Sequence, residues 1–168
     1  ALAAVESMMN VAAVGGTPRA LTDCLNYGNP EIPEHLACLD EGVRGISDAA
    51  RAITFDGECV PVISGNVSLY NETDGQPILP TPTVAIVGQL QDVAHRVSLA
   101  FAPGRSVALL GVPARGALGG SEWLTSKVDD VTGEPVGIDL AAEVRLQRLL
   151  LSLARQQLLA SAHDVSDG

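Results

Sequence analysis

The chain reads Ser64-Gly65-Asn66-Val67-Ser68-Leu69-Tyr70-Asn71-Glu72 directly after an apolar run, Val60 to Ile63, of the kind that forms strands. We interpret this segment as a polar loop held at the end of a buried strand. Its amide and hydroxyl groups can contact water, a metal ion or a phosphate without burying a fixed charge. Gly65 lets backbone N–H groups approach an anion closely. A polar strand exit without a ligand is the alternative interpretation.

A second segment has similar chemistry and reads Leu21-Thr22-Asp23-Cys24-Leu25-Asn26-Tyr27-Gly28-Asn29-Pro30. It places Asp and Asn beside Gly, after a short apolar piece, Ala20 to Leu25, that we expect to form a strand. Three later motifs accompany these two: Pro80 to Val84 leading to Val87-Gly88, Leu118 to Leu124, and His163 to Gly168. Together the five motifs resemble formylglycinamidine ribonucleotide synthetase (phosphoribosylformylglycinamidine synthase), in the synthetase subunit II of its small, multi-subunit form. They stand in the family's order and cover nearly the whole chain.

The resemblance implies an α+β fold, which the irregular order of helical and strand patterns also favours. The family is built from tandem pairs of domains, each pair like aminoimidazole ribonucleotide synthetase. Residues 1–94 then correspond to the later part of an N-terminal-type, nucleotide-binding domain. Residues 95–168 correspond to the opening part of a C-terminal-type domain. Because the chain starts inside a helix-type run and stops inside a Gly/Asp motif, we expect a fragment of a larger protein.

The resemblance also assigns ligands to individual residues. In the family, the positions that match Asp23 and Gly65 contact ATP, the Asn that matches Asn66 contacts magnesium, and the Ser that matches Ser68 contacts substrate. The chain has the same residue type at all four positions. Oxygen ligands suit Mg²⁺, which keeps several of its waters. The alternative is structural, with Asp23 and Asn66 bonding to loop backbone groups as in Asx turns.

By resemblance, the parent enzyme is an ATP-dependent ligase of purine biosynthesis. It converts formylglycinamide ribonucleotide and ammonia to formylglycinamidine ribonucleotide, ADP and phosphate. A partner glutaminase supplies the ammonia, and a small accessory subunit completes the complex. The family's catalytic histidine and its main carboxylate ligands of magnesium belong to the first domain pair, which the five motifs do not include. We therefore expect the chain alone to be inactive.

A different class of function stays open, namely a non-catalytic nucleotide-binding or dimerising module derived from that enzyme. Domains of this type normally pair through their sheets, so a lone copy would expose a face and could form a homodimer. Turnover of ATP by the isolated chain would separate this alternative from the ligase. Selenophosphate synthetase and thiamine-phosphate kinase are more distant alternatives. The amino-acid sequences of the segments 64–72 and 118–124 argue against both.

Composition excludes several classes of partner. A net charge of −10 repels nucleic-acid backbones and anionic membranes. No apolar stretch approaches the roughly 20 residues of a membrane-spanning helix, and no signal peptide opens the chain. Cys24, Cys38 and Cys59 are odd in number and form no C-x-x-C pair, so we expect reduced thiols and a cytoplasmic location.

Local patterns predict most of the elements. We expect helices over 1–14, 33–53 and 139–159, the last capped by Asp139. In the second helix the apolar residues Leu36, Leu39, Val43, Ile46, Ala50 and Ile53 recur on one face, which we expect to be buried. Further strands are expected over 83–90, 97–102 and 107–111. A hairpin turn is expected at 73–76, a domain junction at 91–96, and a helix cap at Ser121.

Overall fold

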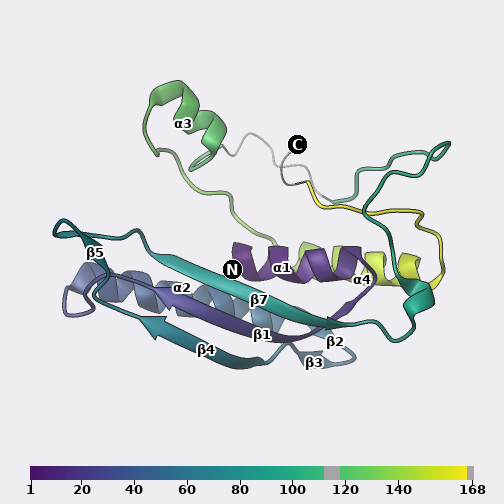
Figure 1. Ribbon diagram of the computed structural model, residues 1–168, viewed down its shortest axis with the longest axis horizontal. Coiled ribbons are helices and arrows are strands. Elements are labelled where there is room, and N and C mark those ends of the chain that lie inside the picture. Colours follow the sequence, from purple (N-terminus) through teal and green to yellow (C-terminus); the bar gives the residue numbers. More distant parts are fainter. Residues whose placement is uncertain (112–117, 166–168) are drawn as a thin grey trace.

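Residues 1–111 and 118–165 are described by this computed structural model, and they form an α+β fold (Figure 1). Within them, the main sheet has the strand order β4-β1-β7. The central strand β1 (Thr17–Asn26) pairs in parallel with β4 (Val62–Ser68) and antiparallel with β7 (Thr81–Gln89). The parallel connection from β1 to β4 passes through a long helix, as parallel pairing requires. The expected fold class is therefore confirmed.

Helices cover one face of this sheet. α1 (Leu2–Ala13), α2 (Pro33–Ala52) and α4 (Leu140–Arg155) lie on the same side, whereas α3 (Glu122–Val128) stands away from the sheet (Figure 1). A short 3-10 turn, η1 (Val93–His95), follows β7. The three helices predicted from sequence are thus present, each within a few residues of its expected bounds.

Alternation along the strands explains how one face of the sheet becomes the core. Leu21 and Leu25 of β1 are buried, and Val84 and Ile86 of β7 pack against the same cluster. Their neighbours in sequence point to the opposite face, because side chains alternate along a strand. The buried cluster comprises Ala4, Val5, Met8, Ala12, Leu21, Leu25, Tyr27, Ile46, Ala49, Ile53, Phe55, Val60 and Leu151.

Two short hairpins complete the strand inventory of the described residues. β2 (Thr54–Phe55) pairs with β3 (Glu58–Cys59), and β5 (Glu72–Thr73) pairs with β6 (Gln76–Pro77). In the second hairpin both turn residues have positive φ, 52° at Asp74 and 74° at Gly75. Asp-Gly is the pair that such two-residue turns favour, so the predicted hairpin is confirmed.

Side-chain caps start two of the helices as expected. Ser121 Oγ accepts a hydrogen bond from Leu124 N at 3.2 Å at the start of α3. Asp139 Oδ1 accepts one from Ala142 N at 3.0 Å at the start of α4. Each cap satisfies a backbone donor that has no partner inside the helix.

Three expectations about local structure are wrong. Residues 97–102 and 107–111 form no strands, and Ser98 instead makes a single isolated bridge with Ser161. A strand requires pairing along its length, and these residues make only isolated backbone contacts with other described segments, such as the bond from Ala162 N to Ser98 O. On α2, Leu36 and Val43 are exposed, because the covered stripe is centred on Ile46, Ala49 and Ile53 and leaves its margin to solvent.

Candidate functional site

The two sequence segments with Asp, Asn and Gly lie side by side in the main sheet. β1 and β4 pair so that Asp23 is opposite Gly65, Cys24 opposite Asn66, and Asn26 opposite Ser68. All four candidate residues therefore lie within one short strip of two adjacent strands. The sequence alone does not show that these residues are close in space, because the paired residues are about forty positions apart along the chain.

The structure corrects the interpretation of 64–68 as a loop after a buried strand. Ser64 to Ser68 belong to β4, and the strand is exposed over nearly its whole length. Gly, Asn and Ser are unfavourable in strands, which made a loop the natural prediction. β4 tolerates them because it lies at the edge of the described sheet, where side chains remain in contact with water.

Asp23 and Gly65 form a close pair on the helix-covered side of the sheet. A Cβ added at Gly65 would collide with Asp23 Oδ1 and would lie 3.0 Å from Asp23 Cγ. The carboxylate therefore extends over Gly65 toward the outer edge of β4. It is half-buried and accepts no hydrogen bond from a described side chain. A carboxylate in this position is available to a donor from a ligand.

The next residue along each strand points to the open face. Asn66 Nδ2 donates to Cys24 Sγ at 3.3 Å, and Ser64 Oγ donates to Thr22 Oγ1 at 2.7 Å. Asn66 is exposed, and its amide nitrogen rather than its oxygen makes this bond. Strand alternation thus places the Asp23–Gly65 pair on one face and the Asn66 side chain on the other.

Ser68 lies where β4 ends and is tied to a turn that holds the two segments together. Ser68 Oγ donates to Asn71 Oδ1 at 3.2 Å, and Asn71 Nδ2 donates to Ser68 O at 2.8 Å and to Tyr27 O at 3.1 Å. Asn71 therefore joins the ends of β1 and β4. The sequence alone assigned no role to Asn71, although this residue belongs to the segment 64–72.

The remaining polar residues of the segment 21–30 hydrogen-bond to backbone groups of the chain itself. Asn29 Oδ1 accepts a hydrogen bond from Glu31 N at 2.8 Å, which forms an Asx turn around Pro30. Asn26 Nδ2 donates to Thr81 O of β7 at 3.3 Å. His35, at the start of α2, is half-buried, with Nδ1 lying 3.1 Å from Asn29 O.

The last motif is described only in part. His163 Nδ1 lies 2.9 Å from Asp164 Oδ1, so Asp164 can fix the orientation of the imidazole. Asp167, the second carboxylate of this motif, lies outside the described residues, as do Ser166 and Gly168.

The donor set fits a nucleotide with a sparsely ligated metal ion. The Asp23 carboxylate can accept hydrogen bonds from hydroxyl groups, and the side-chain oxygen of the exposed Asn66 can give a magnesium ion one protein ligand. Mg²⁺ accepts few protein ligands when phosphate oxygens and water fill its remaining positions. Among residues 1–111 and 118–165, no group of three His, Cys, Asp or Glu side chains is placed to hold a metal ion. A ligand at the β4 edge could contact both faces.

None of the helices in the described ranges combines the length and apolar character needed to cross a membrane.

Comparison with known proteins gives a consistent family. Residues 1–90 match the family described as AIR synthase related protein, N-terminal domain. The phosphoribosylformylglycinamidine synthase subunit PurL of Anaeromyxobacter sp. strain Fw109-5 is 50% identical over 99% of this chain and 21% of that protein. The same subunit of Anaeromyxobacter dehalogenans strain 2CP-C is 49% identical over 99% of this chain and 21% of its own length.

Among solved structures, PurL of Thermotoga maritima complexed with AMPPCP is 36% identical, and the match covers 52% of this chain and 14% of that one with a TM-score of 0.43. The family assignment therefore depends on the sequence matches. The chain spans about a fifth of the length of the PurL relatives it matches. It belongs to the AIR synthase related protein family, carries that family's N-terminal domain in residues 1–90, and is similar over nearly its whole length to phosphoribosylformylglycinamidine synthase subunit PurL.

Proposed function

We propose that this chain supplies a nucleotide-contacting strip of a phosphoribosylformylglycinamidine synthase. The observation that carries the proposal is the Asp23–Gly65 pair, in which a half-buried carboxylate without a described protein donor extends over a glycine at the sheet edge. The 50% identity to PurL over 99% of the chain supports the choice of reaction. The reaction joins ammonia to formylglycinamide ribonucleotide at the expense of ATP, and it belongs to purine biosynthesis.

Each candidate residue has a role suited to its position. Asp23 accepts hydrogen bonds from the nucleotide, and Gly65 keeps the space above the strand open for that carboxylate. The Asn66 oxygen holds one position of a magnesium ion, which would neutralise phosphate charge when bound. Ser68, fixed by Asn71 where β4 ends, presents its hydroxyl to the ribonucleotide substrate.

The whole reaction needs more than this strip. We propose that turnover takes place in a cytoplasmic complex that includes a glutaminase as the ammonia source and a small accessory subunit. Residues 1–94 would form the N-terminal-type domain, with η1 as the junction to the C-terminal-type residues 95–168. The isolated chain would then bind nucleotide without completing the reaction.

Calorimetric titration of the isolated chain tests these roles separately. ATP should bind when magnesium is present and bind more weakly when a chelator removes it. Asp23→Asn should weaken ATP about tenfold, as expected for one lost charged hydrogen bond of roughly 1.5 kcal/mol. Ser68→Ala should leave ATP binding unchanged and weaken formylglycinamide ribonucleotide. Equal affinity of the wild type and the Asp23→Asn chain for ATP would exclude the proposed contact.

Exposed apolar side chains on the edge strands favour a second candidate, a module that dimerises through its sheet. Val87 of β7 is 60% exposed on the face opposite the core residues Val84 and Ile86, and Ile63 of β4 is 64% exposed. Val87→Asp should convert a dimer to a monomer in analytical ultracentrifugation. Val107→Asp serves as the control, because Val107 is exposed and belongs to no strand. A wild-type chain that is monomeric at all concentrations tested would exclude this candidate.

A further inference from the structure

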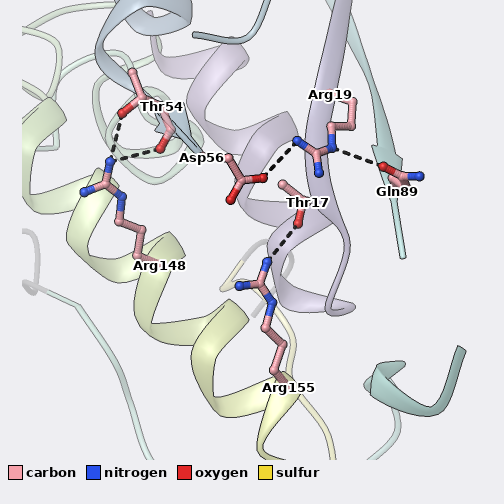
Figure 2. Close-up of polar contacts among 7 residues, drawn as sticks. All are labelled: Thr17, Arg19, Thr54, Asp56, Gln89, Arg148 and Arg155. Atoms are coloured by element: carbon pink, nitrogen blue, oxygen red, sulfur yellow. Dashed lines mark hydrogen bonds and ion pairs between the residues drawn. The ribbon is translucent and has the colours of Figure 1, made fainter. Parts of the chain in front are cut away.

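Arginine side chains gather around a cavity at the other end of β1. The cavity has a volume of about 300 Å³ and lies between α4 and the β2–β3 hairpin. Arg148 and Arg155 line it from α4, and Asp56 lines it from the hairpin turn. Arg19 joins the group through an ion pair with Asp56 at 3.2 Å (Figure 2). Only ten residues of this acidic chain are Lys or Arg, so three arginines beside one aspartate depart from its overall charge.

Neither Arg148 nor Arg155 is neutralised by an acid among the described residues. Arg148 Nη2 donates to Thr54 O at 3.0 Å and to Thr54 Oγ1 at 2.8 Å, and both acceptors are uncharged. Arg155 Nη2 donates only to the Thr17 hydroxyl, at 3.5 Å (Figure 2). In each guanidinium group the bonds use one terminal nitrogen, which leaves the other donors for a further acceptor. The bonds also fix where each group lies.

The remaining wall adds a hydroxyl and an apolar surface. Ser152, one turn from both arginines on α4, accepts a hydrogen bond from Gln156 Nε2 at 2.9 Å, so its own O–H can be donated. Phe55 is buried and forms part of the opposite wall. Two guanidinium forks and a hydroxyl provide more donors than one carboxylate can accept, and they match the oxygens of a phosphate group.

We propose that this cavity binds a small phosphate-bearing ligand through Arg148, Arg155 and Ser152. A volume of about 300 Å³ is at the lower limit for small-molecule sites and suits a phosphate ester or pyrophosphate. A nucleic-acid backbone is disfavoured by the net charge of −10. The inference is independent of the strip at Asp23 and Ser68, which lies at the opposite end of β1.

Titration of the whole chain with inorganic pyrophosphate, at constant ionic strength, tests the cavity. Arg148→Gln and Arg155→Gln should each weaken pyrophosphate about tenfold or more. Arg145→Gln is the matched control, because Arg145 is exposed on the same helix and lines no part of the cavity, and it should bind like the wild type. Citrate should bind more weakly than pyrophosphate if the site selects phosphate rather than carboxylate.

A variant that removes negative charge from the cavity tests the proposal without relying on the arginine variants, which could lose binding because they are less stable. Asp56 has a φ of 55°, a conformation that Asn also adopts readily, so Asp56→Asn keeps the turn while it removes the only carboxylate lining the described cavity. Pyrophosphate should then bind several-fold more tightly. The proposal is overturned if pyrophosphate does not bind, or if citrate binds as tightly as pyrophosphate. It is also overturned if Arg145→Gln loses as much affinity for pyrophosphate as Arg148→Gln and Arg155→Gln. The same holds if Asp56→Asn does not change the affinity for pyrophosphate.

Discussion

The Asp23 carboxylate lies over Gly65, its partner on the neighbouring parallel strand, in the space that a Cβ at Gly65 would need. The absence of a side chain at one residue therefore sets the position of a charged group on another strand. The proposed nucleotide contact depends on this arrangement.

Gly65→Ala should destabilise the fold by about 1 kcal/mol, because the new methyl group must displace the Asp23 side chain. Urea unfolding of the unliganded chain measures the effect. Gly137→Ala is the matched control, since a Cβ there meets no atom within 4 Å. If Gly65→Ala proves as stable as Gly137→Ala, the close packing of Asp23 on Gly65 is wrong.

Asp139→Ala should lower the free energy of unfolding by about 1 kcal/mol, because Ala142 N at the start of α4 loses its acceptor. Asp139→Asn keeps an acceptor oxygen at the same position and should stay near the wild type. Thermal unfolding followed by circular dichroism compares the three chains. Equal midpoints for Ala and Asn would show that this cap does not stabilise α4.

Gln147 is fully buried on α4, and its Oε1 has no hydrogen-bond partner among the described residues. Its Nε2 makes only a long bond of 3.5 Å to Val5 O. Gln147→Met keeps a similar volume and removes the unpaired oxygen, so we expect a gain of about 1 kcal/mol in urea unfolding. Gln91→Met, at an exposed position in the turn after β7, should change little. A clear loss of stability in Gln147→Met would contradict the assignment of an unpaired oxygen.

Burial, with a smaller contribution from the Cys38 charge, raises the pKa of the Tyr27 phenol above its usual value of about 10. Because the folded pKa exceeds the unfolded one, this contribution to stability is complete below about pH 10 and is lost as the pH rises through the folded pKa. Tyr27→Phe should therefore reduce the loss of stability above pH 10. In Tyr70→Phe, which leaves Tyr27 as the only tyrosine, phenolate absorbance should appear above pH 10; appearance at or below that value would contradict the prediction.

Local signals in the sequence predicted the local features of this fold. The caps at Ser121 and Asp139 act within three residues, and the turn at Asp74-Gly75 depends on two. The pairing of Asp23 with Gly65 is not local, and nothing in either segment shows that the two strands run in parallel at this offset. For the same reason the sequence could not show that Asn66 and Asp23 point to opposite faces.

The sequence wrongly predicted two strands and did not predict the arginine cavity, and both failures arise because the features depend on residues distant in the sequence. Residues such as Val107 have strand propensity, yet a strand forms only where another backbone is available to pair with it. Arg148, Arg155 and Asp56 come from two distant segments, and no motif in the sequence connects them. Family resemblance supplied the identities of the site residues, and the structure supplied their arrangement.

Thermal unfolding with and without Mg-ATP tests the central proposal most directly. Ligand at about 100 times its dissociation constant stabilises a protein by about 2.7 kcal/mol, which for this chain corresponds to a shift of roughly 5–10 °C. The shift should vanish in Asn66→Ala and persist in Ser64→Ala, whose hydroxyl lies on the same strand and face. A chain that unfolds cooperatively at the same temperature with and without Mg-ATP would contradict a nucleotide site at Asp23, Gly65 and Asn66.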